Sequence, residues 1–110
     1  MAVLSDPVKR ILAQVRDGLA RIYGPRLKGL VLYGSHARGE ATEDSDLDVL
    51  FILDDFESPV AEINRTSALA SEVSLEHDLT VCLLPVRHHA WQSHDSVFLT
   101  VAREEGVLVP

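Results

Sequence analysis

Two aspartates, Asp46 and Asp48, stand at the start of a strongly apolar segment, LDVLFIL, at residues 47–53. Alternate residues of a β-strand point to the same side, so this segment, read as a strand, projects both carboxylates together while Leu47 and Val49 turn into the core. Two adjacent carboxylates repel each other, and burying them without a partner is costly. A divalent cation removes that cost, and carboxylate oxygens favour Mg²⁺ or Mn²⁺ over zinc. The pair therefore predicts a cation site.

A third carboxylate, Asp78, begins a later apolar segment, DLTVCLLP, at residues 78–85. A helix is expected between the two segments, so they should form parallel strands that start at the same edge of a sheet. We therefore expect Asp78 beside Asp46 and Asp48, as the third ligand of a site that holds two metal ions about 4 Å apart. Glu76 is a competing third acid, less favoured because it precedes the strand pattern.

A glycine–serine pair is expected at the same edge. The segment KGLVLYG at residues 28–34 reads as a strand, and the short link to residues 47–53 favours an antiparallel pair. Gly34 lets a phosphate approach the backbone closely, while the Ser35 hydroxyl and the amides of a helical turn over residues 35–38 can donate to it. Arg38 lies one turn later, where it either meets a triphosphate or is an ordinary surface arginine.

Helices are expected before and between these strands. Residues 5–24 read as a helix, because Ser5 or Asp6 can cap it, Pro7 suits its first position and an apolar stripe follows. The members of that stripe recur three or four residues apart: Val8, Ile11, Leu12, Val15, Leu19 and Ile22. Ser58 and Pro59 repeat the cap-then-proline pattern and predict a helix to about Val73, with Ile63, Ala70 and Val73 facing inward.

The last quarter of the chain is less regular. Residues 86–95 read as an irregular segment or the start of a helix, residues 96–106 as a short helix that ends at Gly106, and residues 107–110 as a small edge strand. The order of elements indicates an α/β fold in which helices cover a small mixed sheet. At 110 residues the chain is long enough for a single domain, expected over residues 1–110.

Composition limits the classes of partner and compartment. The net charge of −7 argues against a direct nucleic-acid partner. No apolar run approaches the roughly 20 residues that a membrane span needs, and the first ten residues lack the order of a secretory signal. The single cysteine, Cys82, lies in an apolar run without a basic neighbour, so we expect a buried thiol rather than a nucleophile, and a cytoplasmic protein.

Two other features of the sequence do not predict a functional site. His88, His89 and His94 with Asp95 suggest a zinc cluster, but they lack a paired cysteine or a helical HExxH pattern, so no zinc site is expected. Trp91 is interpreted as a packing residue or part of a partner surface.

The segment GSHARGEATEDSDLDVLFIL places Gly34-Ser35 ten residues before Asp46-Leu47-Asp48. This arrangement resembles the signature of the DNA polymerase β-type nucleotidyltransferase superfamily. Within it, this segment and the ending REEGVLV are most similar to the minimal nucleotidyltransferases (MNT), the antitoxin partners of HEPN-domain toxins, over roughly residues 5–110. The resemblance implies the nucleotidyltransferase fold and maps the third metal carboxylate of the family onto Asp78; His36 lies where the family varies and receives no role.

The resemblance also implies a reaction: transfer of AMP from ATP to a hydroxyl, a tyrosine of a HEPN RNase toxin, with two Mg²⁺ ions. Asp46 and Asp48 would hold both ions, Asp78 would serve the ion that activates the hydroxyl, and Gly34 and Ser35 would hold the β- and γ-phosphates. Because the chain has no room for a second domain, the acceptor should dock from outside. Two alternatives stay open: an antitoxin that acts by binding alone, against which the expected third carboxylate argues, and a subunit that modifies a small molecule such as an aminoglycoside together with a separate helical chain.

Overall fold

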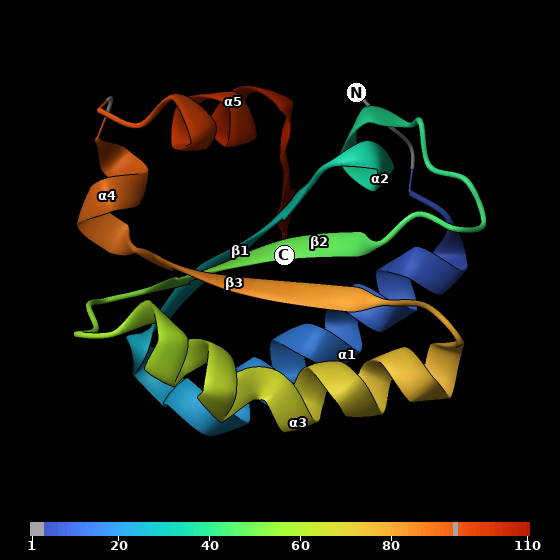
Figure 1. Ribbon diagram of the computed structural model, residues 1–110, viewed down its shortest axis with the longest axis horizontal. Helices are drawn as coiled ribbons and strands as arrows, with labels where there is room; N and C mark the ends of the chain where they lie inside the picture. Colours follow the sequence, from blue (N-terminus) through green and yellow to red (C-terminus); the bar gives the residue numbers. More distant parts are fainter. Residues whose placement is uncertain (1–3, 94) are drawn as a thin grey trace.

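A computed structural model describes residues 4–93 and 95–110 of the chain. Helices cover a four-stranded sheet, as predicted, and Figure 1 shows α1 and α3 on one side of it, with α4 and α5 on the other. The elements, in chain order, are α1 (Asp6–Tyr23), the 3₁₀ turn η1 (Gly24–Arg26), β1 (Leu27–Tyr33), α2 (Ser35–Arg38), β2 (Leu47–Leu53), α3 (Pro59–His77), β3 (Val81–Arg87), α4 (His88–Gln92), α5 (Val97–Glu105) and β4 (Val107–Val109).

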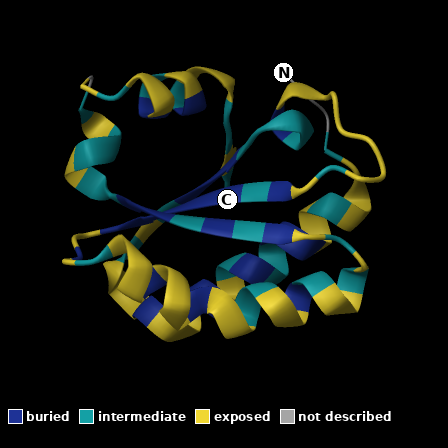
Figure 2. Cartoon of the chain, in the orientation of Figure 1, coloured by how far each residue is buried: buried dark blue, intermediate teal, exposed yellow. Residues whose placement is uncertain are grey.

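The sheet is mixed, with the strand order β3-β2-β1-β4. β1 pairs antiparallel with β2 and β4, and β2 pairs parallel with β3, so the predicted strand directions are confirmed. β2 lies in the middle, and all of its residues except Asp48 are buried (Figure 2). The strand that begins between the two aspartates is therefore held on both sides by neighbours.

α1 begins as the sequence predicts, because the Ser5 hydroxyl accepts a hydrogen bond from the Val8 amide at 3.3 Å. Its apolar stripe faces the sheet, with one exception. Ile22 is 40% exposed, and the neighbouring Tyr23 is buried in its place. Tyr23 stacks on Phe51 and donates its hydroxyl proton to Glu62 at 2.8 Å, which explains why the aromatic residue occupies the buried side.

α3 departs from the sequence prediction at both its buried face and its end. Ile63, expected to face inward, is 38% exposed, whereas Glu62 and Thr66 are buried. Glu62 tolerates burial because it receives the Tyr23 hydroxyl and pairs with Arg65 at 3.0 Å. The helix also continues past Val73 to His77, so β3 begins at Val81 and not at Asp78.

Each face of the sheet has its own buried core. One core joins α1 and α3 to the side chains of β1, β2 and β3 on their side, and it includes Leu19, Leu32, Val49, Phe51 and Val73. The other lies under α5, and its members are Val31, Leu50, Ile52, Val86, Leu99 and Ala102. No helix in the described ranges is both long enough and apolar enough to cross a membrane.

Candidate active site

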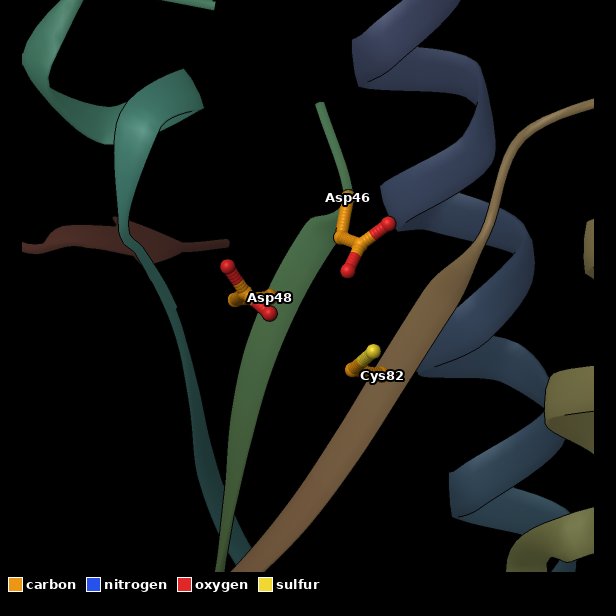
Figure 3. Close-up of side chains that lie close together, drawn as sticks. All are labelled: Asp46, Asp48 and Cys82. Carbon is orange, nitrogen blue, oxygen red and sulfur yellow. The ribbon is translucent and has the colours of Figure 1, made fainter. Parts of the chain in front are cut away.

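Three potential metal ligands gather where β2 and β3 begin. Asp46 precedes β2, Asp48 is its second residue, and Cys82 is the second residue of β3. Figure 3 shows all three side chains on the same side of the two strands. One carboxylate oxygen of each aspartate and the Cys82 sulfur lie within 4.8 Å of one another. The predicted convergence of Asp46 and Asp48 is thus observed.

The two aspartates lack a directly paired basic side chain in the part of the chain that the structure describes. Neither carboxylate forms an ion pair or a side-chain hydrogen bond with another residue among those the structure describes. Partial burial raises the pKa of Asp48 above its ordinary value, and the negative charge of Asp46 raises that pKa further; His36 and Arg38 act in the opposite direction. A divalent cation would relieve both the burial and the repulsion.

Gly34 brings the backbone against this pair. It lies between β1 and α2 with a φ of 79°, a conformation that residues other than glycine rarely adopt. A Cβ at this position would lie 2.6 Å from Oδ2 of Asp48, so a larger residue would be strained and would displace the carboxylate. The preceding residue, Tyr33, pairs with Asp48 across β1 and β2. The predicted glycine turn and the carboxylates are therefore direct neighbours.

The turn that follows Gly34 carries Ser35 and Arg38. The Ala37 and Arg38 amides donate to the Gly34 carbonyl at 3.1 and 3.2 Å, which closes α2 as a single helical turn. Arg38 is close enough to act on the pKa of Asp48. Its guanidinium, however, pairs with Glu40 at 3.1 Å and with Glu105 at 3.8 Å. Arg38 would have to leave these exposed partners to meet a phosphate.

The structure does not bring Asp78 to the pair. Asp78 is exposed and ends α3 in the left-handed conformation, with a φ of 50° and its amide bonded to the Ser74 carbonyl. The Leu47 amide donates to the Thr80 carbonyl at 2.8 Å. The start of β2 is therefore paired with residues that follow Asp78 in the chain. Glu76, the competing acid, lies in α3 and accepts a hydrogen bond from Gln14 at 2.6 Å.

Cys82 stands where a third carboxylate was predicted. It pairs with Asp48 in the parallel β2–β3 register, and it is half-buried instead of enclosed in the core. Burial, Asp46 and Asp48 together raise the pKa of its thiol. The sequence shows that Val81 and Leu83 alternate with Cys82, as Leu47 and Val49 alternate with Asp48, but it does not show the register that pairs Cys82 with Asp48.

A cavity of about 260 Å³ adjoins the glycine turn between β1, α2 and α5. Tyr33 and Phe98 line it, with their rings edge to face at 5.7 Å. Burial, followed by the nearby charge of Asp48, raises the pKa of Tyr33 to about 12, so this hydroxyl stays protonated at neutral pH. A cavity of about 290 Å³ between α1 and β4 shares no residue with the aspartate site.

The histidines of the last quarter of the chain lie elsewhere. His88 and His89 begin α4, and His89 approaches Asp55 at 3.9 Å, at the opposite end of β2. His94 lies outside the described residues. Trp91, also in α4, packs against the core under α5, and the Arg103 guanidinium lies 5.6 Å from the centre of its ring.

Comparison with known proteins places this geometry in context. The model of the nucleotidyltransferase domain family matches residues 12–100. The candidate protein adenylyltransferase MJ0141 of Methanocaldococcus jannaschii is 30% identical over 71 residues, which are 64% of this chain and 71% of that protein. A second candidate protein adenylyltransferase of that organism, MJ1379, is 39% identical over 59 residues, and the match spans only 56% of its length.

Solved structures share the fold at low sequence identity. A chain of a toxin–antitoxin complex with AMP-PNP aligns with a TM-score of 0.64 and 21% identity, over 90% of this chain and 72% of that chain. A structure of the tri-AMPylated HEPN toxin of Shewanella oneidensis in complex with MNT antitoxin aligns with a TM-score of 0.53 and 16% identity, over 90% and 71% of the two chains. The predicted fold is confirmed by these alignments.

Proposed function

Because the chain belongs to the nucleotidyltransferase domain family, we propose that it transfers AMP from ATP to a hydroxyl group on a partner protein. The observation that carries this proposal is the contact between Gly34 and Asp48. It sets a turn suited to phosphate against two carboxylates that have no ion-pair partner among the described residues. ATP and a divalent cation are the ligands that this combination fits.

The residues fit a divalent cation. Asp46 and Asp48 offer oxygen ligands from one side of the sheet, and the raised pKa of Asp48 reflects the burial and repulsion that a cation would remove. They are the proposed ligands of the two Mg²⁺ ions that nucleotidyl transfer uses, whereas Asp78 ends α3 and is not part of their cluster in this structure. When bound, such ions neutralise the triphosphate and make the acceptor hydroxyl a better nucleophile.

The chain's own groups would orient the nucleotide. The Ser35 hydroxyl and the first amides of α2 donate to the β- and γ-phosphates, and Gly34 leaves room for them beside Asp48. Arg38 can exchange Glu40 and Glu105 for a phosphate, because exposed ion pairs are worth only about 0–1 kcal/mol. With the triphosphate fixed, the acceptor oxygen bonds to the α-phosphorus and its proton passes to solvent, while the bond from the α-phosphorus to the oxygen bridging to the β-phosphate breaks and pyrophosphate leaves.

The proposed acceptor is a tyrosine hydroxyl of a HEPN RNase toxin, and the chain would act as its antitoxin in the cytoplasm. Support comes from analogy with the Shewanella oneidensis complex, in which the HEPN toxin is tri-AMPylated. The surface of α5 supports a protein partner: Val97, Phe98 and Val101 are 81%, 49% and 43% exposed, and Phe98 and Val101 also line the cavity beside Gly34. A partner on α5 would thus lie next to the proposed nucleotide.

One observation favours a second function, neutralisation of the toxin by binding alone. The argument against it was a complete set of three carboxylates, and the structure gathers only two, with Cys82 at the third place. A site with one ligand replaced is expected to retain nucleotide binding more readily than transfer. The two functions make different predictions for the mass of the toxin.

Intact mass spectrometry separates these functions. The chain, its co-expressed toxin, ATP and Mg²⁺ are incubated together, and both proteins are weighed. Enzymatic action adds one or more AMP groups to the toxin, and the Asp46→Asn, Asp48→Asn double variant is the matched control that should add none. Full loss of the toxin's RNase activity without any added mass would refute the enzymatic function and support neutralisation by binding.

A further inference from the structure

Cys82 is the third ligand-bearing side chain at the carboxylate pair. We propose that its sulfur binds the cation held by Asp46 and Asp48, and that this site therefore prefers thiophilic divalent cations to Mg²⁺. The inference rests on the proposed cation-binding role of the two aspartates.

The strand pairing fixes the position of the sulfur. β2 and β3 pair in register from Leu47–Val81 to Leu53–Arg87 without a break, and this register sets Cys82 opposite Asp48. Side chains of paired residues in a parallel sheet point to the same face, and Figure 3 shows the thiol turned toward the carboxylates. Cys82 is half-buried, as Asp48 is, so its side chain is not enclosed in the core.

The distances suit a shared ion. The three ligand atoms lie within 4.8 Å of one another. Metal–oxygen and metal–sulfur bonds of about 2.1 and 2.3 Å place two ligands roughly 3.6 Å apart in a tetrahedral site. Small side-chain rotations can bring the ligand atoms from their present separation to that distance, because Asp46 precedes the strand and is exposed.

The ligand chemistry then selects the ion. Mg²⁺ requires oxygen ligands in near-octahedral geometry, whereas a thiolate favours softer ions such as Zn²⁺ and, by the same chemistry, Cd²⁺. Two carboxylates alone would favour Mg²⁺ or Mn²⁺. Replacing the third oxygen by sulfur shifts the preference of the whole site, and Cys82→Asp should shift it back.

Cd²⁺ is the probe, because a cadmium–thiolate bond has an ultraviolet charge-transfer band. Cys82 is the only cysteine, so the band can come from no other residue. Titration of the wild type should give a saturable band. Cys82→Ser, with Cys82→Ala as a second variant, should lose it, and the Asp46→Asn, Asp48→Asn double variant should need at least about tenfold more Cd²⁺.

The Mg²⁺ affinity of the wild type is measured by competition with Cd²⁺ and by calorimetry. Mg²⁺ should displace Cd²⁺ from the wild type only weakly. Cys82→Asp has no band of its own, so its Mg²⁺ affinity is followed by calorimetry and should exceed that of the wild type by at least about tenfold. A circular dichroism melt of each variant confirms that it is folded.

Two results would overturn the inference: no band in the folded wild type, or a band of equal affinity in the double variant, which would mean a thiol that binds Cd²⁺ alone. The proposed function is tested separately by AMP transfer with Mg²⁺. Transfer without a cadmium band rejects the role of Cys82 and leaves the function standing. A band that depends on both aspartates, in a protein that transfers no AMP with Mg²⁺ or with Zn²⁺, supports the metal site and rejects the enzymatic function.

Discussion

Both ends of β2 carry two aspartates, and the two pairs differ in their partners. At the end of the strand, Asp54 accepts a hydrogen bond from Arg26 at 3.1 Å, and Asp55 pairs with Arg87 at 3.2 Å. At its start, Asp46 and Asp48 lie beside each other and beside Cys82, with no arginine or lysine paired to them among the described residues. The same residue type is thus surrounded in two opposite ways within one strand.

The pKa values express this difference. The Asp55 amide, and then Arg26, hold the pKa of Asp54 below its ordinary value, while burial and Asp46 raise the pKa of Asp48. An aspartate whose positive partner belongs to the fold contributes to structure. An aspartate that has no such partner in the fold and is partly buried beside another carboxylate is a candidate ligand, because its charged form is costly until a cation binds. The two ends of β2 therefore differ in the charged partners of their aspartates and not in residue type.

The largest expected effect comes from removing the carboxylates of Asp46 and Asp48. Asp46→Asn with Asp48→Asn should lower AMP transfer by at least about 10³-fold, because the cation loses both carboxylates. The matched control is Asp54→Asn with Asp55→Asn at the other end of β2, which should transfer AMP at close to the wild-type rate. The rate of AMP addition to the toxin, followed by mass spectrometry, is the measurement. Equal losses of AMP transfer in the two double variants would contradict a functional difference between the two ends of β2.

The glycine beside Asp48 offers a second contrast. Gly34→Ala should weaken binding of ATP with Mg²⁺ by up to about 10²-fold, because its Cβ would displace the Asp48 carboxylate. Gly24, before β1, also has a positive φ, of 57°, but no atom lies within 4 Å of an added Cβ. Gly24→Ala should therefore share the backbone strain, about 1–2 kcal/mol, and keep its affinity. Calorimetry compares the affinities, and a parallel loss in Gly24→Ala would attribute the effect to strain.

The stability of the two ends should depend on pH with opposite signs. Because the pKa of Asp48 is raised in the folded state, this residue makes the metal-free protein less stable as pH rises from about 3.8 through the folded value. Asp48→Asn should remove that loss. Asp54, whose pKa is lowered, contributes stability that is present above its unfolded pKa and disappears as pH falls through the folded value.

Thermal melts at several pH values, in EDTA and with a divalent cation, measure these effects. At pH 7 the cation should raise the melting temperature of the wild type by a few degrees and leave the Asp48→Asn variant almost unchanged. Asp54→Asn should show only a small shift, since that carboxylate is exposed, and should respond to the cation like the wild type. A cation effect that survives in Asp48→Asn would contradict the assignment of the site.

The smallest effect is expected at Asp78. Its side chain is exposed at the end of α3, and asparagine tolerates the left-handed conformation that Asp78 adopts. Asp78→Asn should therefore leave cation affinity and folding nearly unchanged, in contrast with Cys82→Ser. Cadmium and magnesium titrations of the two variants provide the comparison. A large loss of affinity in Asp78→Asn would restore this residue as the third ligand.

The sequence by itself determined much of the molecule, because the relevant signals are local. The Ser5 cap with Pro7 set the start of α1, the uniform apolar run after Asp46 identified β2, and the spacing from Gly34 to Asp48 indicated the site and its family. These signals depend on residues a few positions apart, and helix capping and strand alternation act at that range.

Only the tertiary structure decided which side chain of β3 lies opposite Asp48. The residue of β3 that faces Asp48 depends on where α3 ends. α3 continues past Val73 to His77, where Gln14 of α1 bonds to both Glu76 and His77, and the left-handed Asp78 closes it. This shift moves the start of β3 to Val81 and puts Cys82, not Asp78, opposite Asp48. In the same way, Glu62 replaces Ile63 on the buried face only because Tyr23, distant in sequence, supplies its hydrogen bond. Register and partners of this kind arise from contacts between distant segments, which the spacing of residues along the chain does not encode.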